Sequence, residues 1–526
     1  MKERINILFI LSVILFSINS ESLSATYYVS YSTGNDLKDG LSPKTAWKYC
    51  PNMRLSANNF FRNTGTGHTI IKGDTIYFKR GDIWDGVYLH VYSDLGGITF
   101  SSRSDFAIPG HESTLPQIRP WVLNNSGWTL ESGSIYSKYI GSTIRQVGVW
   151  YNGIPLQWVE SNAPGSNKWY WNQSQGQIYV NIGDNPNGKD IRIAPWVAAV
   201  DLWGNDWIVE YLDLSRGAFG LQISKTKGVV NNCIVRYNKL HDTEYNYKTG
   251  SDQRNYSQGF FSNRLNNFQF IGNEMYNISL TVPGDGRAHG CYIGYNVHNA
   301  IIAYNYAHDC NAGAGIQTYS DSPAAPESVN VKIYGNLIAS CDVGIFYWDC
   351  TGCILANNTI INSFKGGIST NNTPDSSIVN NIFSNPKATN TNNNYPYDIS
   401  WRASTGLSIP DYNYYYRASN AEYILRMEGN PVKYYRITDW ATYRTAYPTW
   451  DAHSIASTNS PFNRTPNFIN SLAGGKGQDI SSVLGSNMML DPQTTWPLEV
   501  KIVKQRSGAW DIGAYSAISS SSISSP

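Results

Sequence analysis

The stretch CIVRYN at residues 233–238 begins a pattern that the chain repeats five more times. Each copy places β-forming residues on alternate positions and ends on an asparagine. The later copies are FQFIGN (268–273), IIAYN (301–305), VKIYGN (331–336), ILANN (354–358) and SSIVNN (376–381). Their asparagines are separated by 35, 32, 31, 22 and 23 residues. A repeat of about 22 residues holds three short strands and three bends, which is the size of one coil of a parallel β-helix.

The repeated asparagine has a physical role in such a coil. An amide that points inward at a bend can accept a hydrogen bond from one neighbouring coil and donate one to the next. Its neighbours in sequence are apolar because each coil buries its inner face only by stacking on another coil. We therefore expect a single internal ladder formed by Asn238, Asn273, Asn305, Asn336, Asn358 and Asn381.

Three further motifs frame this repeat. They are YYVSYSTGNDLKDGLSPKTAW (27–47), GDTIYFKRGDIW (73–84) and WDIGAY (510–515). Together with the asparagine repeat, they resemble the pectate-lyase-like superfamily of secreted, carbohydrate-active proteins. This resemblance spans nearly all of the chain after residue 25 and implies an all-β, right-handed parallel β-helix, a solenoid. It does not select a reaction, because the fold hosts lyases, hydrolases, epimerases and binding proteins.

The remaining segments can be assigned around the repeat. We expect an N-terminal cap and first coils at 26–100, a β-rich, Trp-containing insertion or elaborated coils at 101–205, and regular coils with the ladder at 206–385. C-terminal coils and loops should follow at 386–516. The Ser-rich stretch 517–526 has the composition of a disordered tail.

The first 25 residues predict export. Lys2 and Arg4 precede an apolar run at 5–18, and small residues follow up to Ala25, which is the layout of a signal peptide. We therefore expect a secreted protein, extracellular or periplasmic, without a membrane span. The net charge of +1 gives no basic field for nucleic acid, so that class of partner is excluded. We expect the mature protein to be a monomer that binds a polysaccharide.

A polar and aromatic stripe is expected on one face of the coils. The resemblance implies that sugars bind along the strands that open with glycine, such as GFFSN (259–263), GCYIG (290–294) and GIFYW (344–348). Alternate residues of a strand point outward, and rings and amides there suit sugar faces and hydroxyls. The substrate-binding candidates are Phe261, Asn263, Tyr292, Gln317, Tyr319, Phe346 and Trp348.

Lengthened loops beside these strands carry most of the nearby ionisable groups. They lie at 244–257, 279–288 and 320–328, and long loops on a rigid scaffold commonly carry function. Within GDGRAHGCY (284–292), Asp285, Arg287 and His289 lie close to the stripe. We predict His289 or a nearby Lys or Arg as the base, Arg287 as the partner of a substrate carboxylate, and Asp285 as an orienting or metal-binding acid. The alternative is a purely structural role, in which an Asp–Arg pair holds this loop at the edge of the stripe.

These groups favour β-elimination on a uronic-acid-containing polymer, the reaction of a polysaccharide lyase. A lyase needs cations for the carboxylate and a base, whereas a glycoside hydrolase needs two carboxylates across the cleft. A hydrolase on the same fold is the first alternative. A non-catalytic sugar-binding or adhesive β-helix is the second. Calcium is an optional cofactor, with Asp342 and Asp349 as conceivable ligands beside loop carbonyls.

Overall fold

The computed structural model describes residues 24–517 apart from thirteen short gaps. These gaps are 57–66, 93–94, 143–144, 226, 250–251, 280–286, 321–327, 385–396, 403–406, 420–421, 430, 464–468 and 506–508. The expected signal peptide, the Ser-rich tail and Asp285 therefore lie outside the described residues, apart from 24–25 and Ala517. Within the described part, no helix is long and apolar enough to cross a bilayer.

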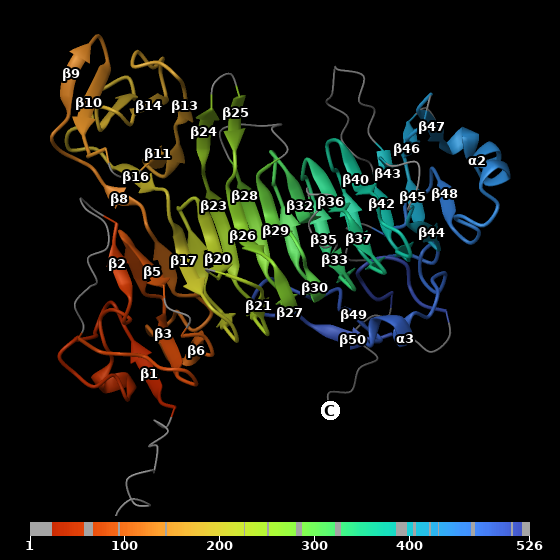
Figure 1. Ribbon diagram of the computed structural model, residues 1–526, viewed down its shortest axis with the longest axis horizontal. Coiled ribbons are helices and arrows are strands. Elements are labelled where there is room, and N and C mark those ends of the chain that lie inside the picture. Colours follow the sequence, from red (N-terminus) through yellow and green to blue (C-terminus); the bar gives the residue numbers. More distant parts are fainter. Residues whose placement is uncertain are drawn as a thin grey trace, which may run out of the picture.

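The chain winds through three long sheets, here named A, B and C, whose strands pair almost entirely in parallel (Figure 1). Each regular coil contributes one strand to B, then one to A, then one to C. Sheet A holds β1 (Thr26–Val29), β3 (Thr75–Arg80), β6 (Thr99–Ala107), β18 (Ile208–Glu210), β22 (Ile234–Arg236), β27 (Leu265–Ile271), β30 (His298–Ala303), β34 (Lys332–Tyr334), β38 (Ile354–Ala356), β41 (Ser377–Val379) and β44 (Ile409–Asp411), with β21 (Val230–Asn231), β33 (Ser328–Val329) and β37 (Cys350–Thr351) beside them.

Sheets B and C complete the coil. Sheet B holds β2 (Met53–Leu55), β5 (Val87–Val91), β17 (Ala198–Trp203), β20 (Phe219–Ser224), β26 (Gln258–Asn263), β29 (His289–Gly294), β32 (Ala314–Tyr319), β36 (Val343–Trp348), β40 (Gly366–Asn371), β43 (Tyr397–Trp401), β46 (Tyr423–Met427) and β47 (Lys433–Arg436). Sheet C holds β4 (Ile83–Asp85), β7 (Gln117–Arg119), β19 (Asp213–Ser215), β23 (Lys239–Thr243), β28 (Glu274–Ile278), β31 (Tyr306–His308), β35 (Leu337–Ala339), β39 (Thr359–Ile361), β42 (Ile382–Ser384), β45 (Tyr414–Tyr416) and β48 (Ile455–Ser457). The predicted right-handed parallel β-helix is confirmed.

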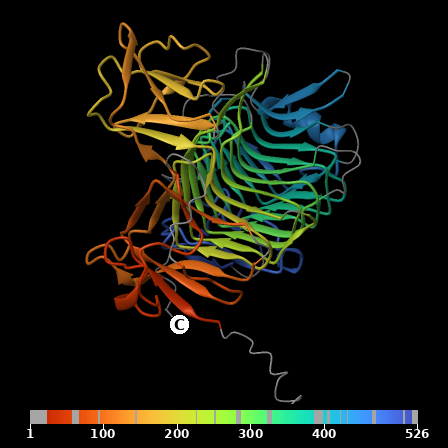
Figure 2. The same ribbon diagram turned by 60° about the vertical axis from the view of Figure 1, so that its left-hand side comes forward.

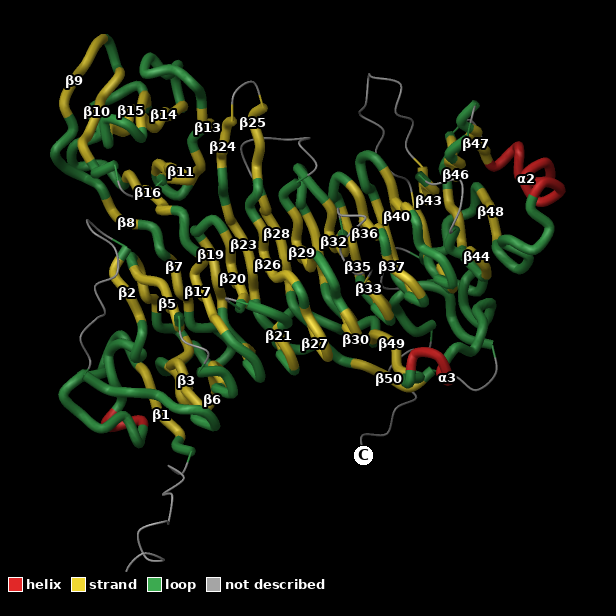
Figure 3. Tube along the Cα trace, in the orientation of Figure 1, coloured by secondary structure: helices red, strands yellow, loops and turns green. Residues whose placement is uncertain are grey.

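Helices are few among the described residues and lie near the two ends of the chain (Figure 3). They are the 3₁₀ turns η1 (Pro43–Thr45) and η2 (Ile437–Asp439) and the α-helices α2 (Trp440–Ala446) and α3 (Ser481–Leu484). One continuous apolar core fills the coil instead. It includes the residues that the alternation of the glycine strands sends inward: Leu221, Phe260, Cys291, Ile316, Ile345 and Ile368, all fully buried.

The asparagine ladder is confirmed. All six predicted asparagines are fully buried. The Asn305 side chain shows the pattern: its Oδ1 accepts from the backbone N–H of Asn273 at 2.8 Å, and its Nδ2 donates to Asn336 Oδ1 at 2.9 Å. The ladder continues one coil further than predicted, because Asn381 Nδ2 donates to Asn413 Oδ1 at 3.1 Å.

The interval 101–205, expected to hold an insertion or elaborated coils, contains both. Its first part still forms coil strands β6 and β7, and its last strand, β17, belongs to sheet B. Between them stands an insertion with its own core, which includes Trp128, Trp169 and Ile178. Figure 2 shows it projecting from the N-terminal part of the stacked coils. It holds two antiparallel-rich sheets made of β8 (Val122–Leu123), β9 (Thr129–Ser132), β10 (Ile135–Tyr139), β11 (Gln146–Tyr151), β12 (Ile154–Pro155), β13 (Gln157–Trp158), β14 (Lys168–Asn172), β15 (Gln177–Asn181) and β16 (Ile191–Pro195).

Two smaller features complete the fold. A hairpin of β24 (Asn246–Thr249) and β25 (Asp252–Asn255) projects on the same side as the insertion (Figure 1). After β48, the chain runs back along the outside of sheet A through β49 (Met488–Leu490) and β50 (Ile502–Lys504). Trp510 and Tyr515 of the closing motif are buried there against the outer side chains of sheet A.

Replacing Asn305 by Leu should lower stability. The leucine would remove the acceptor of the Asn273 backbone N–H and the side-chain donor to the Phe270 carbonyl, whereas Asn336 Oδ1 would keep the backbone N–H of residue 305. An unsatisfied buried polar group costs about 1–3 kcal/mol. Urea unfolding followed by circular dichroism measures this loss. Asn125→Leu, at an exposed position of the insertion, is the matched control and should change stability little. Equal stability of both variants would contradict a ladder role.

Candidate functional site

The outward side chains of sheet B form regular rows along the coils. In one row, strand pairing places Phe261 beside Tyr292, Tyr292 beside Gln317, and Gln317 beside Phe346. The Phe261 and Tyr292 rings stack with centroids 5.4 Å apart. A second row, two residues later on each strand, contains Tyr319 and Trp348, whose centroids lie 5.7 Å apart. Register alone therefore gathers the aromatic residues on one face.

A cavity of about 1210 Å³ opens over this face. All seven residues predicted to bind substrate lie on its wall, as do Arg287 and His289. Asp285 falls outside the described residues, so its position relative to the cavity stays a prediction. The binding and catalytic roles of the other nine also stay predictions, although the structure brings the nine side chains together.

Several lining residues were not foreseen from the sequence. Arg145 immediately precedes β11 of the insertion, Trp196 immediately follows β16, and Arg402 follows β43. Four more lie on sheet B or its adjoining turns: Tyr245, Tyr256, Gln258 and Tyr295. Gln258 immediately precedes the glycine of its strand, so the strand register could have found it. Arg145 and Trp196 reach the cavity only because the insertion docks there, which no repeat pattern reveals.

Guanidinium groups and aromatic rings alternate along the cavity wall. Arg287 Nη1 donates to the Tyr256 hydroxyl at 3.2 Å, and Arg145 Nη1 donates to the Tyr245 hydroxyl at 3.4 Å. The Arg402 guanidinium lies 5.5 Å from the Trp348 ring centroid. No carboxylate is present among the described lining residues. This wall is therefore suited to an anion, since guanidinium forks match carboxylate and sulfate-like groups.

His289 is held rigidly at the base of the cavity. Its side chain is only 3 % exposed, and burial lowers its pKa to about 3, so the imidazole is neutral. Nδ1 accepts from the backbone N–H of Ala314 at 2.9 Å. A neutral ring that accepts at Nδ1 carries its proton on Nε2. In this state His289 offers a hydrogen-bond donor rather than a free base.

Gln258 fixes the segment that carries Arg287 and His289. Its Oε1 accepts from the His289 backbone N–H at 2.9 Å, and its Nε2 donates to the Arg287 carbonyl at 2.9 Å. The carboxamide thus bridges two coils and orients both predicted catalytic residues.

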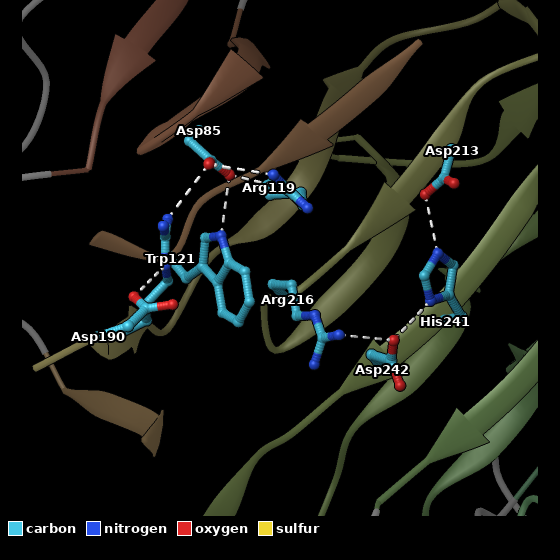
Figure 4. A network of polar contacts seen from close by, with 9 residues as sticks. Asp85, Arg119, Trp121, Asp190, Asp213, Arg216, His241 and Asp242 are labelled. Atoms are coloured by element: carbon cyan, nitrogen blue, oxygen red, sulfur yellow. Dashed lines mark hydrogen bonds and ion pairs between the residues drawn. The ribbon is translucent and has the colours of Figure 1, made fainter. Parts of the chain in front are cut away.

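An ion-pair network, drawn in Figure 4, joins the insertion to the neighbouring coils. Asp85 of β4 accepts from Arg192 of the insertion at 3.2 Å, from Arg119 of β7 at 2.7 Å and from the Trp121 indole at 2.9 Å. The Arg216 guanidinium lies 4.6 Å from the Trp121 ring centroid and pairs with Asp242 at 3.0 Å. Apolar contacts reinforce the junction, because Trp121 and Trp150 share a buried cluster with the cavity residue Tyr245.

His241 ends this network between two carboxylates. Its Nε2 lies 2.8 Å from Asp213 Oδ1, and its Nδ1 lies 2.8 Å from Asp242 Oδ2. Burial by itself would lower the pKa of His241, but the carboxylates of Asp213 and Asp242 outweigh it and raise that pKa to about 9. A histidine charged at neutral pH therefore neutralises Asp213 and Asp242, and Asp242 in turn pairs with Arg216.

His241→Gln should destabilise the protein most at mildly acidic and neutral pH. The folded-state pKa of about 9 lies above the ordinary value of 6.5, so protonation stabilises the fold fully below about pH 6.5 and loses its effect as the pH rises through 9. The difference in unfolding free energy between wild type and variant, up to roughly 3 kcal/mol, should shrink between pH 6.5 and 9.5. Thermal or urea unfolding at several pH values measures it. His111→Gln, at an exposed position, is the control; parallel pH profiles for wild type and His241→Gln would refute the assignment.

Comparison with known proteins gives distant matches only. A model of the family described as "Periplasmic copper-binding protein (NosD)" matches residues 206–419, and no curated protein sequence matches the chain. Among solved structures, the complex of XylC with xylose is 13% identical and covers 76% of each chain (TM-score 0.45). A glycoside hydrolase is 10% identical and covers 77% of this chain and 95% of its own (TM-score 0.47).

Pectate lyase Pel9A is 11% identical and covers 71% of this chain and 79% of its own (TM-score 0.36). Likeness at this distance carries no argument about chemistry. On the geometry of its own sheets, the chain has the fold that its sequence motifs predict, the right-handed parallel β-helix of pectate-lyase-like proteins.

Proposed function

We propose that this protein is an extracytoplasmic carbohydrate-active enzyme that cleaves an acidic polysaccharide by β-elimination, acting as a monomer. The observation that carries the proposal is the make-up of the cavity wall. It holds three arginines, a row of rings and no carboxylate among its described residues. A glycoside hydrolase needs a pair of carboxylates roughly 5–9.5 Å apart, so the same wall disfavours hydrolysis.

Sugar rings would bind against the aromatic rows. Phe261, Tyr292 and Trp348 present faces that suit the apolar side of a sugar. The Trp348 ring lies on the cavity wall beside Tyr319 and Phe346, so the three rings form one aromatic patch. Arg287, Arg402 and Arg145 would receive the carboxylates of a uronic acid.

The elimination can be assigned to groups around the uronate. Arg287 would neutralise the carboxylate and stabilise the charge that develops on it as the adjacent C–H breaks. The base would be the ionised form of Tyr256, whose phenolate oxygen Arg287 contacts; it would take that proton and become a phenol. The C–H electron pair becomes the C=C bond, the C–O bond to the leaving sugar breaks, and the leaving oxygen would take its proton from the Tyr256 phenol, which restores the phenolate. His289 Nε2–H would donate a hydrogen bond to the leaving oxygen without losing its proton, so its proposed role moves from base to hydrogen-bond donor.

Metal ions are not needed for this scheme. Asp342, a conceivable calcium ligand, is 4 % exposed and binds Lys365 Nζ at 2.7 Å, so it does not fit a free oxygen ligand. Within the described residues, no group of three or more His, Cys, Asp or Glu could hold a metal ion. For the same reason, we do not carry over the copper binding named in the matched family's description.

The burial of His289 supports one competing function. A histidine that is bonded on Nδ1 and nearly inaccessible is what a non-catalytic sugar-binding β-helix would show, because such a protein needs the cavity but no proton transfer. Catalysis and binding differ in their products. Incubation with polyuronates and neutral polysaccharides, with and without EDTA, should yield an ultraviolet-absorbing unsaturated product from a polyuronate in both conditions. Reducing ends without that absorbance would indicate hydrolysis. If no product forms from any polymer, the non-catalytic binding function is the one supported.

Substitution of the two lining residues tests their roles directly. His289→Ala and Arg287→Ala should each reduce kcat/KM on the preferred polymer by roughly 10²-fold or more, the scale of a lost transition-state donor or proton-transfer group. Arg103→Ala, an exposed arginine far from the cavity wall, is the control. Turnover that survives in both variants while the melting temperature falls would show a scaffolding role for this segment.

Binding should depend on the aromatic rows independently of turnover. Tyr292→Ala and Trp348→Ala should each weaken oligosaccharide affinity by about 1 kcal/mol, the scale of one aromatic contact. Isothermal titration calorimetry with uncleaved product oligomers measures the change. Tyr139→Ala, at an insertion residue that is 69% exposed, is the control. Unaltered affinity in both cavity variants would refute sugar stacking on this face.

A further inference from the structure

A second, smaller pocket adjoins the cavity on the face of sheet B. It has a volume of about 350 Å³, and its wall includes Trp203, Lys225, Arg264 and Tyr295. Asn263 and Tyr295 line both the pocket and the cavity. A chain molecule lying in the cavity can therefore continue into the pocket across these two residues. Strand register places Trp203 beside Ser224 on β20, the strand next to β26, which carries Asn263.

The Trp203 ring is fixed as a platform. Its Nε1 donates to Asp201 Oδ1 at 3.1 Å, and the Tyr92 ring lies 4.9 Å from it between centroids. Asp201 Oδ2 is in turn 2.9 Å from His90 Nδ1. An aromatic residue whose edge is tied down loses little freedom when a sugar stacks on its face.

Positive charge in this pocket is uncompensated. Neither Lys225 nor Arg264 makes an ion pair within the described part of the chain; Lys225 Nζ reaches only Asn205 Oδ1, at 3.5 Å. The backbone of Arg264 is pinned, because its N–H donates to the carbonyls of Gly294 and Tyr295 at 2.9 and 2.8 Å. At the junction, Asn263 Oδ1 is buried and has no hydrogen-bond partner among the described residues. The pocket thus offers two cations for an anion.

We propose that this pocket is a second subsite for an acidic sugar unit of the same polymer, stacked on Trp203, with its acid group bound by Lys225 and Arg264. The inference rests on the proposed function and narrows its substrate. Trp203 lies on β17, two strands away from β26, which lines the cavity. At the usual spacing of strands, these two strands are about 10 Å apart. The substrate is then a polymer with acid groups on closely spaced units, rather than a neutral chain with isolated acids.

The double variant Lys225→Ala/Arg264→Asn tests the subsite. Asparagine is chosen because residue 264 has a φ of 56°, a conformation that asparagine tolerates. Steady-state kinetics on short and long oligomers of galacturonate, mannuronate or glucuronate, whichever wild type cleaves, should show kcat/KM for the hexamer reduced about tenfold or more, with the dimer unaffected. The salt dependence of hexamer binding in affinity electrophoresis should also weaken. Lys227→Ala, two residues away, exposed and outside the pocket wall, is the matched control and should match wild type.

The outcomes separate this proposal from the proposed function. Wild type that neither binds nor cleaves any polyuronate would overturn the proposed function and the subsite with it. Wild type that cleaves a polyuronate, with equal chain-length dependence in the double variant, would overturn the subsite alone. Trp203→Ala is a second variant that leaves both cations in place: it should lose the preference for long oligomers and keep the salt dependence. Melting temperatures of both variants verify that each is folded.

Discussion

The structure depends on the satisfaction of buried amides between stacked coils. Each ladder asparagine is removed from water, so its carboxamide must find partners inside the coil or cost about 1–3 kcal/mol. The neighbouring coil supplies them only if the coils stay in register. The same register orders the other side chains, and it aligns Phe261 with Tyr292 and Gln317 with Phe346 on the opposite part of the coil surface. The aromatic face is thus an indirect product of a hydrogen-bond requirement in the interior.

The fold and most of the stripe could be predicted because both follow from local repeats. A buried asparagine recurs in each coil, and strand alternation then decides which residue of GFFSN or GIFYW faces outward. Asn413 escaped notice because its copy, IPDYN (409–413), carries a proline and aspartate where the other copies carry β-forming residues. Arg145, Trp196 and Arg402 escaped for another reason. Arg145 and Trp196 reach the cavity because the insertion packs there, and Arg402 because of the path of the turn after β43. Neither feature produces a repeating pattern in the sequence.

The position of His289 was easier to predict from the sequence than the protonation and hydrogen bonding of its ring. Sequence position indicated a histidine near the stripe, with an ordinary pKa suited to proton transfer. The coil instead encloses the ring, and the backbone of Ala314 occupies the nitrogen that a base would use. The buried ring therefore offers the Nε2–H as a hydrogen-bond donor and has no free basic nitrogen at Nδ1. Across the wall, Arg287 and Arg145 each donate to a phenol hydroxyl. The described lining residues include none of the paired carboxylates that hydrolysis uses.

The returning segment outside sheet A affects how the molecule unfolds. A solenoid whose coils touch only their neighbours can lose them one at a time. Here the Tyr304 hydroxyl donates to the Met488 carbonyl, and the Trp496 indole donates to the Tyr304 carbonyl, across 184 and 192 residues of chain. Asn357 likewise donates to the carbonyl of Asp511. These contacts connect the middle coils to the last part of the described chain. Unfolding that starts at the C-terminal coils must therefore also detach the returning segment from the middle coils. The stack thereby gains a long-range cooperativity that contacts between neighbouring coils alone do not give. The same contacts should slow folding, because residues far apart in the sequence must meet before they form.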